Sequence, residues 1–281
     1  MEATKFQKLN QKEHEILKMI LDLIPSLTEE PDFCSILDGH IDKLYFNKED
    51  FERSPNSLKP LIELIAELPH LRALDLNDCE LTELPESFRH LGDLERLSLG
   101  KNKFKEFPEV VLECTNLKML NISENRLTAL PGGISRLNNL GHIAVNKNQL
   151  RGLPDSICKI KKLRNMYAYG NQIEAIPECI GQLSNLKLIS LDGNKIRKIP
   201  NSIGQLKKLK ILELGGNHIT EVPDSVGQLE KLSKMDLRDN QIAVLPDSLQ
   251  SLKNLSTLKI FDGNPISELP RGVNEQVRWV S

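Results

Sequence analysis

The segment from Leu163 to Asn185, LRNMYAYGNQIEAIPECIGQLSN, decides how this chain folds. It has a leucine followed by alternating apolar residues, an asparagine at the ninth position and a proline at the fifteenth. Segments of the same kind begin every 23 residues, at Leu71, Leu94, Leu117, Leu140, Leu163, Leu186, Leu209, Leu232 and Leu255. Self-similarity at a fixed period of this length indicates stacked structural repeats that share one continuous core, which is a solenoid.

The opening positions of each repeat predict a short strand. Apolar residues at positions four and six alternate with exposed positions, which is the periodicity of a β-strand. Successive strands lie 23 residues apart, too far for hairpins, so we expect them to pair in parallel. Position fifteen is proline in all nine repeats, which suits an extended segment outside the sheet. The predicted fold class is an α/β repeat solenoid with a parallel concave sheet, short extended or 3-10 convex segments and an N-terminal helical cap.

The asparagine at position nine predicts a structural ladder. Backbone groups that are buried where each coil turns inward need hydrogen-bond partners, and an Asn amide both donates and accepts. Cys79 replaces the asparagine in the first regular repeat. The other eight repeats have Asn102, Asn125, Asn148, Asn171, Asn194, Asn217, Asn240 and Asn264.

Four segments follow from the pattern. Residues 1–33 lack the repeat, and apolar residues at helical spacing before Pro25 predict a capping helix, with a docking helix for a partner as the alternative. Residues 34–70 are expected to form an atypical first coil, with a helix from about Leu58 to Leu68 after an N-cap at Ser57. Residues 71–270 hold the nine repeats, and residues 271–281 are expected to form a C-terminal cap.

Two details of the repeats carry expectations of their own. The last repeat is one residue longer than the others between Leu255 and Asn264, which predicts a bulge in its strand. Glycines recur just after the last apolar residue of three repeats, at Gly181, Gly204 and Gly227, and suggest a tight turn there.

Charge and cysteine usage narrow the class of protein. The chain has 37 basic and 39 acidic residues and a net charge of −2, which argues against a general nucleic-acid or anionic-membrane binder. Its five cysteines show no metal-ligand spacing, so free thiols in a reducing compartment are expected. Cys158 and Cys179 lie at nearby convex positions of adjacent repeats, and two separate thiols are favoured there over a disulfide or a metal site.

The N-terminal region bears on localisation. Lys18 and Asp22 interrupt its apolar residues, which argues against a cleaved secretory signal, and no apolar run is long enough to span a bilayer. We therefore expect a cytoplasmic protein, with secretion by a signal-peptide-independent route as the alternative.

The repeats beginning at Leu163, Leu186 and Leu209 resemble the L-P-x-x-I-G-x-L repeats of 23-residue leucine-rich-repeat proteins. Such repeats occur widely in bacterial proteins, notably those of spirochaetes, and in intracellular Ras-group scaffold proteins. The resemblance covers most of the chain and implies a right-handed parallel solenoid that binds proteins on its concave face. Some bacterial relatives are secreted effectors with a ubiquitin-ligase domain after the repeats, and the short tail here predicts no such domain.

Positions three, five and seven of each repeat flank the inward-facing strand residues, so they are expected to face the concave surface. Large apolar and aromatic groups gather there in repeats three to seven, and tyrosine is frequent at interface hot spots. The predicted partner-binding residues are Met119, His142, Asn165, Tyr167, Tyr169, Leu188, Ser190, Asp192, Ile211 and Glu213. In the alternative interpretation these residues only pack against one another across neighbouring strands.

Basic residues gather at and just before position two of several repeats. They are Lys161, Lys162, Arg164, Lys187, Lys207, Lys208 and Lys210. This basic edge is either a solvated surface or a site for an acidic partner or a phosphate backbone, and the salt dependence of binding separates the two.

The sequence thus predicts a non-enzymatic, monomeric protein–protein interaction module. It contains no motif for a catalytic, cofactor-binding or metal site, and we expect neither a membrane nor a nucleic acid as partner. Two alternatives remain open: a self-associating structural protein, or a binder of an acidic ligand or nucleic acid along the basic edge.

Overall fold

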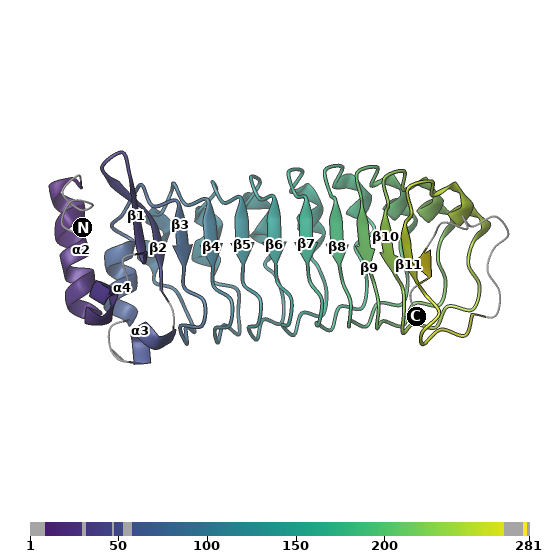
Figure 1. The fold of residues 1–281 in the computed structure, drawn as a ribbon, viewed down its shortest axis with the longest axis horizontal. Helices are drawn as coiled ribbons and strands as arrows, with labels where there is room; N and C mark the ends of the chain where they lie inside the picture. The colour runs from purple at the N-terminus through teal and green to yellow at the C-terminus, as the bar shows by residue number, and fades with distance from the viewer. Residues whose placement is uncertain (1–8, 30–31, 47, 53–57, 267–277, 280–281) are drawn as a thin grey trace. The chain divides into compact units, whose positions relative to one another are not determined.

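The computed structural model describes residues 9–29, 32–46, 48–52, 58–266 and 278–279 (Figure 1). The chain divides into two compact units, unit 1 with residues 1–126 and unit 2 with residues 127–281. Among the described residues, no helix has both the length and the apolar character needed to cross a bilayer.

Unit 1 begins with helix α2 (Gln11–Leu23), followed by the 3-10 helix η1 (Pro25–Glu29). Asn10 caps α2, because its side chain accepts a hydrogen bond from the Glu13 backbone N–H at 3.0 Å. The buried Glu13 carboxylate in turn accepts from the Ile41 N–H at 2.6 Å and lies 2.8 Å from the His40 ring nitrogen. These contacts tie α2 to the first strands of the unit.

Strands β1 (Cys34–Leu37) and β2 (His40–Tyr45) form an antiparallel hairpin. Its turn residues, Asp38 and Gly39, both have positive φ, +52° and +82°, as a type I′ hairpin turn requires. This antiparallel pair was not predicted, although Asp-Gly between apolar residues is a strong hairpin signal.

The other strands of unit 1 pair in parallel, in the order β2, β3, β4 and β5. The helix α4 is shorter than predicted and ends at Ile65, and its predicted N-cap, Ser57, lies outside the described residues. The remaining elements of unit 1 are α3 (Lys48–Glu52), α4 (Leu58–Ile65), β3 (Ala73–Asp75), η2 (Glu86–His90), β4 (Arg96–Ser98), η3 (Glu109–Glu113) and β5 (Met119–Asn121).

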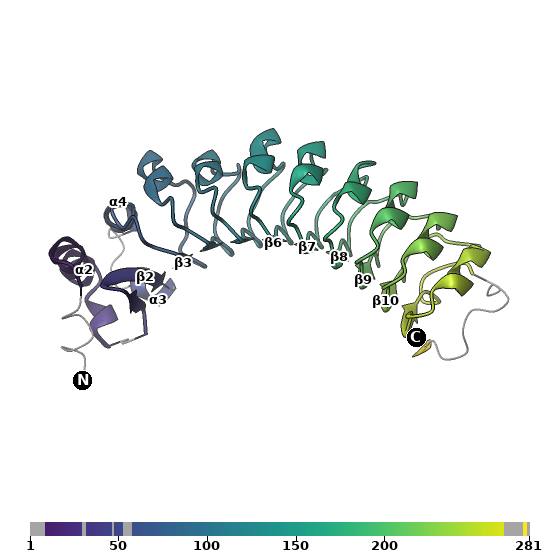
Figure 2. The same ribbon diagram turned by 90° about the horizontal axis from the view of Figure 1, so that it is seen from above.

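Unit 2 repeats one strand and one 3-10 helix per coil, and its neighbouring strands from β6 to β11 pair in parallel. Within this unit the 3-10 helices lie on the side away from the strands (Figure 2). The strands are β6 (His142–Ala144), β7 (Asn165–Tyr167), β8 (Leu188–Ser190), β9 (Ile211–Glu213), β10 (Lys234–Asp236), β11 (Thr257–Lys259) and β12 (Arg278–Trp279). The 3-10 helices are η4 (Gly132–Arg136), η5 (Asp155–Lys159), η6 (Ile180–Gln182), η7 (Asn201–Gln205), η8 (Asp224–Gln228) and η9 (Asp247–Ser251).

The core of each unit is built from the apolar positions of the repeats. In unit 2 the position-four side chains Ile143, Met166, Ile189 and Leu212 are fully buried. The prolines at position fifteen directly precede most of the 3-10 helices, in an extended conformation, as at Pro200. The predicted parallel-sheet repeat fold is confirmed in both units.

The position-nine asparagines satisfy buried backbone groups. The Asn171 carbonyl oxygen accepts from the Leu150 N–H at 3.0 Å, and its amide nitrogen donates to the carbonyl oxygens of Val145 and Ala168 at 3.1 and 3.0 Å. Asn102 and Asn125 in unit 1, and Asn194, Asn217 and Asn240 in unit 2, make the same set of bonds. Asn148 accepts from the Leu127 N–H, and Asn264 accepts from the Ile242 N–H.

The prediction of a bulge in the last repeat is wrong. Strand β11 pairs with β10 in unbroken register, Lys234 with Thr257 and Asp236 with Lys259. The Asn264 amide donates to the carbonyl four residues earlier, Ile260, whereas its counterparts donate to the carbonyl three residues earlier. The extra residue therefore lies in the turn after β11. The pattern showed the surplus residue but not its place, because apolar spacing does not locate an insertion within a turn.

The recurring glycines mark a close approach between coils, where a tight turn had been suggested. A Cβ added at Gly204 would lie 2.4 Å from the Ser225 carbonyl oxygen of the next coil, and one at Gly227 would lie 2.4 Å from the Ser248 carbonyl oxygen. No side chain larger than hydrogen fits at that distance without a shift of backbone.

Most of the predicted C-terminal cap, residues 271–277 and 280–281, lies outside the described residues. Strand β12 is described and pairs in parallel with β11.

Candidate functional site

The exposed face of the unit 2 sheet brings nine of the ten predicted partner-binding residues together. Strand register places His142, Asn165, Leu188 and Ile211 in one row, and Tyr167, Ser190 and Glu213 in a second row. Tyr169 and Asp192 follow two residues after the second row in their own coils. Met119, the tenth, lies in β5 of unit 1, where its side chain is 41% exposed.

Four side chains of this face form what we call the apolar patch: Tyr167, Tyr169, Leu188 and Ile211. All four are half-buried, and Leu188 and Ile211 are direct cross-strand neighbours. Within the described part of the chain, neither tyrosine hydroxyl makes a hydrogen bond. Each tyrosine thus combines a partly exposed apolar ring with a polar hydroxyl group.

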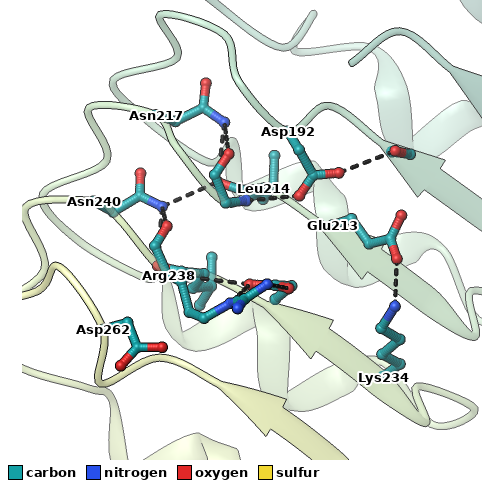
Figure 3. Close-up of polar contacts among 12 residues, drawn as sticks. Asp192, Glu213, Leu214, Asn217, Lys234, Arg238, Asn240 and Asp262 are labelled. Carbon is teal, nitrogen blue, oxygen red and sulfur yellow. Dashed lines mark hydrogen bonds and ion pairs between the residues drawn. The ribbon is translucent and has the colours of Figure 1, made fainter. Parts of the chain in front are cut away.

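Ser190 was predicted to contact a partner directly, but the residue is only 3% exposed. Its hydroxyl donates to Asp192 Oδ2 at 3.0 Å, and Asp192 Oδ1 accepts from the Gly215 N–H at 3.0 Å (Figure 3). Ser190 thus orients a carboxylate of the face. Burial raises the pKa of Asp192 above its ordinary value of 3.8, and the nearby charge of Glu213 adds to that rise.

The charged residues beyond the patch are mostly paired with one another. The Lys234 ammonium lies 2.5 Å from Glu213 Oε1, and Arg238 holds Asp236 through two contacts of 2.8 and 3.1 Å (Figure 3). These ion pairs were not predicted from the sequence. Each joins two different positions of the repeat, and the apolar spacing says nothing about contacts between such positions.

The basic edge separates into two groups. Lys161, Lys162, Lys207 and Lys208 each donate to a carbonyl oxygen or an amide oxygen of a neighbouring coil or turn. Arg164, Lys187 and Lys210 are exposed, and their side chains have no hydrogen-bond or ion-pair partner among the described residues. We call these three residues the basic column.

The expectation of two separate thiols at Cys158 and Cys179 is wrong. The two residues form a disulfide across adjacent coils, with their Cα atoms 5.9 Å apart. Their sequence separation of 21 residues nearly equals one repeat, so the coil geometry brings the two sulfurs together. The repeat pattern places the two residues close together, but the odd number of cysteines and the charged residues among the N-terminal apolar ones favoured free thiols.

The three free cysteines, Cys34, Cys79 and Cys114, are buried. Burial raises the pKa of the Cys114 thiol to about 12 and moves that of Cys79 strongly in the same direction. Both thiols stay protonated at neutral pH and are poor nucleophiles. Within the described ranges, no group of three or more His, Cys, Asp or Glu side chains is arranged to hold a metal ion.

Comparison with family models decides the classification. A model described as "leucine-rich repeat region" matches residues 50–140 and 174–275, and one described as "leucine rich repeat" matches residues 115–173. The chain belongs to the leucine-rich-repeat family. The resemblance that the repeats carry is thereby confirmed. No curated protein matches this leucine-rich-repeat chain in sequence.

Solved leucine-rich-repeat structures resemble it over most of its length. The plant peptide hormone receptor RGFR1 in complex with RGF2 is 34% identical, with a TM-score of 0.65 over 72% of this chain and 34% of that chain. The PEPR1–AtPEP1 structure is 25% identical, with a TM-score of 0.71 over 88% of this chain and 38% of that chain. This leucine-rich-repeat chain thus spans about a third of the length of these receptor chains.

A bacterial structure shares the fold. An internalin from Listeria monocytogenes is 18% identical, with a TM-score of 0.64 over 92% of this chain and 96% of that chain. At this identity the similarity shows the leucine-rich-repeat architecture alone.

Proposed function

We propose that this leucine-rich-repeat chain is a non-enzymatic module that binds a protein partner through the exposed sheet face of unit 2. The observation that carries the proposal is the apolar patch, where one coil has two tyrosines whose hydroxyl groups have no hydrogen-bond partner in the described part of the chain. Apolar surface with polar tips and a charged surround is typical of interaction sites. Solved relatives that are receptors in complex, such as RGFR1 with RGF2, support a role in protein recognition.

The test replaces both tyrosines, Tyr167→Ala and Tyr169→Ala, in the full chain. We expect the double variant to bind its partner at least about 2 kcal/mol more weakly, as a pair of central hot-spot residues should. Partners are identified by affinity capture with the wild-type chain and mass spectrometry, and their affinity for both chains is then measured by calorimetry. The melting temperature should change little, because both rings are half-exposed.

A matched control replaces another partly exposed aromatic residue of a sheet face, Tyr45→Ala in β2 of unit 1. This variant should bind the captured partner like the wild type. Equal affinity of the wild type and the Tyr167/Tyr169 variant would refute the assignment of the apolar patch.

The disulfide supports a proposal about location. Disulfides persist in oxidising surroundings and are rare in the reducing cytosol. Since Cys158 and Cys179 are joined, we propose that the chain acts in an oxidising compartment, which favours the alternative of secretion over the expected cytoplasmic location. Mass spectrometry of the protein trapped with an alkylating reagent in its native source tests this, because free thiols at both positions would contradict it.

A further inference from the structure

The residues of the basic column directly precede three consecutive strands of unit 2, β7, β8 and β9. The Lys187 N–H donates to the Arg164 carbonyl oxygen at 2.7 Å, and the Lys210 N–H donates to the Lys187 carbonyl oxygen at 2.8 Å. The three residues are therefore backbone neighbours at the spacing of strands in a sheet, about 4.8 Å. Three like charges at this spacing repel one another, and the structure supplies no counter-charge to them among its described residues.

The neighbouring lysines of the basic edge, in contrast to the basic column, have hydrogen-bond acceptors. Lys162 donates to Asn139 at 2.6 Å, and Lys208 donates to Asn185 at 2.7 Å, each one coil away. Both acceptors are asparagine side chains of the preceding coil. Arg164, Lys187 and Lys210 have no such acceptor among the described residues.

The extent of the column coincides with the extent of the apolar patch. The same repeat position holds Gly141 in the preceding coil and Ser233 and Ser256 in the two following coils, and the serine hydroxyls donate to backbone carbonyl oxygens. Within unit 2, positive charge at this position is therefore confined to the coils of β7, β8 and β9. These coils are the ones that supply Tyr167, Leu188 and Ile211 to the patch.

The two features together define the chemistry of an occupant. The basic column attracts anionic groups of the occupant, and the apolar patch beside it offers a surface on which apolar side chains of the occupant can pack. A nucleic acid would bring phosphates but no apolar side chains. An acidic stretch of protein that also carries aliphatic or aromatic residues satisfies both features.

We propose that Arg164, Lys187 and Lys210 bind carboxylate groups of an acidic segment of the protein partner while the apolar patch binds the apolar residues of that segment. This inference rests on the protein-binding function proposed above and adds the chemical class of the partner. It makes the basic column a determinant of specificity, because a neutral segment would leave three cations without counter-charges.

The experiment selects peptides from a random twelve-residue display library on the intact chain. The wild type should enrich sequences with Asp or Glu beside apolar residues. The variant Arg164→Gln, Lys187→Gln, Lys210→Gln should lose the acidic enrichment and keep the apolar one. In fluorescence anisotropy, the best selected peptide should bind this variant at least about tenfold more weakly than the wild type, and its affinity for the variant should depend less on salt.

The matched control carries the same charge change outside the sheet, as Arg151→Gln, Arg197→Gln, Lys198→Gln. These three residues are exposed and lie between the ladder asparagine and the proline of their coils. This variant should select and bind the same peptides as the wild type. An equal loss of acidic enrichment in it would mean that net charge alone attracts the peptides, and this would overturn the proposal.

Three further results would overturn the proposal: no selected peptides, no acidic enrichment with the wild type, or unchanged enrichment with the variant of the basic column. A twelve-residue oligodeoxythymidine that displaces the best peptide and prefers the wild-type column would assign the column to nucleic acid instead. Failure of the proposed function would give a different result. In that case the Tyr167/Tyr169 double variant would still enrich peptides with apolar residues.

Discussion

Single side chains in this fold satisfy several buried backbone groups at once, and Asn171 illustrates the point. Its side chain makes four hydrogen bonds, to Leu150, Val145, Ala168 and Tyr169. All four partners are backbone groups where the coil turns inward, and no solvent replaces a lost partner there because Asn171 is buried.

Asn171→Ala should destabilise the chain by roughly 1–3 kcal/mol, because it leaves buried backbone groups without partners. Chemical denaturation measures the change in the free energy of unfolding. The control is Asn201→Ala, an exposed asparagine of η7, which should stay within about 0.5 kcal/mol of the wild type. A midpoint for Asn171→Ala equal to that of the control would refute the structural role of the ladder.

Asp192 carries a pH dependence whose sign follows from its environment. Burial holds its folded-state pKa above the unfolded value of 3.8, so the folded chain binds the proton more tightly. This contribution to stability is complete below the unfolded pKa and is lost as the pH rises through the folded pKa. The charged form is therefore the costly one at neutral pH.

Asp192→Asn should raise the free energy of unfolding at neutral pH relative to the wild type, and this advantage should shrink as the pH falls towards 3.8. The amide oxygen can still accept from the Gly215 N–H, so the geometry is kept. Thermal melts over a pH series provide the measurement, with the exposed Asp224→Asn as control. A variant that is less stable than the wild type at pH 7 would contradict the assignment of burial as the dominant cause.

At the scale of elements, the 3-10 helices of neighbouring coils approach one another through glycine. Gly204 of η7 faces the backbone of Ser225 in η8, where an added Cβ would have only 2.4 Å. Gly152 shares the residue type but has nothing within 4 Å of an added Cβ. The two positions therefore separate steric contact from the general effect of glycine replacement on the unfolded chain.

Gly204→Ala should destabilise the chain by about 1–3 kcal/mol, the usual cost of forcing extra volume into a packed site. Gly152→Ala should be neutral or slightly stabilising, by up to about 1 kcal/mol, because alanine restricts the unfolded chain. Urea denaturation of both variants measures the two effects. Equal stability of the two variants would show that the coils can move apart without cost.

Much of this fold was predictable from the sequence, and the exceptions have physical reasons. Strands, parallel pairing and the convex segments follow from apolar spacing and the prolines, because both act within a single coil. The antiparallel β1 was signalled by Asp38 and Gly39 but lay outside the repeat. The recurrence of Gly204 and the nearby positions of Cys158 and Cys179 were visible in the sequence. The close approach depends on the neighbouring coil and the disulfide on oxidation, so neither follows from the pattern of one coil.

The candidate site was predictable in part. Alternation along the strands indicated which residues of the sheet face, such as Tyr167 and Leu188, remain accessible. It did not indicate that Ser190 is covered and supports Asp192, since that depends on a side-chain hydrogen bond. Nor could counting the basic residues separate Lys208, which has an acceptor, from Lys210, which has none among the described residues.

At the scale of the whole molecule, repeat proteins derive stability from the sum of contacts between neighbouring coils. The bond between Cys158 and Cys179 adds a covalent link to one such interface, and it closes a loop with a sequence separation of 21 residues. Such a link restricts the unfolded chain, and its loss typically costs about 2–4 kcal/mol.

Reduction with a phosphine should therefore lower the midpoint of chemical denaturation, by an amount that corresponds to roughly 2–4 kcal/mol. The control is the double variant Cys158→Ala, Cys179→Ala, whose midpoint should not respond to the reductant. Thiol titration of the unfolded wild type should rise from three to five groups on reduction, since Cys34, Cys79 and Cys114 are free. Five reactive thiols before reduction would contradict the link.

The glycine–serine contact between coils has an evolutionary consequence. The coil that starts at Leu186 offers Ser202 to Gly181 on one side and Gly204 to Ser225 on the other, and the next coil repeats the arrangement. The two sides of this coil are mutually complementary. A block of 23 residues can therefore be deleted or copied here, and each new pair of adjacent coils still makes the same glycine–serine contact. Descendants of this sequence can therefore lengthen or shorten in whole blocks, and each added block extends the parallel sheet by one strand.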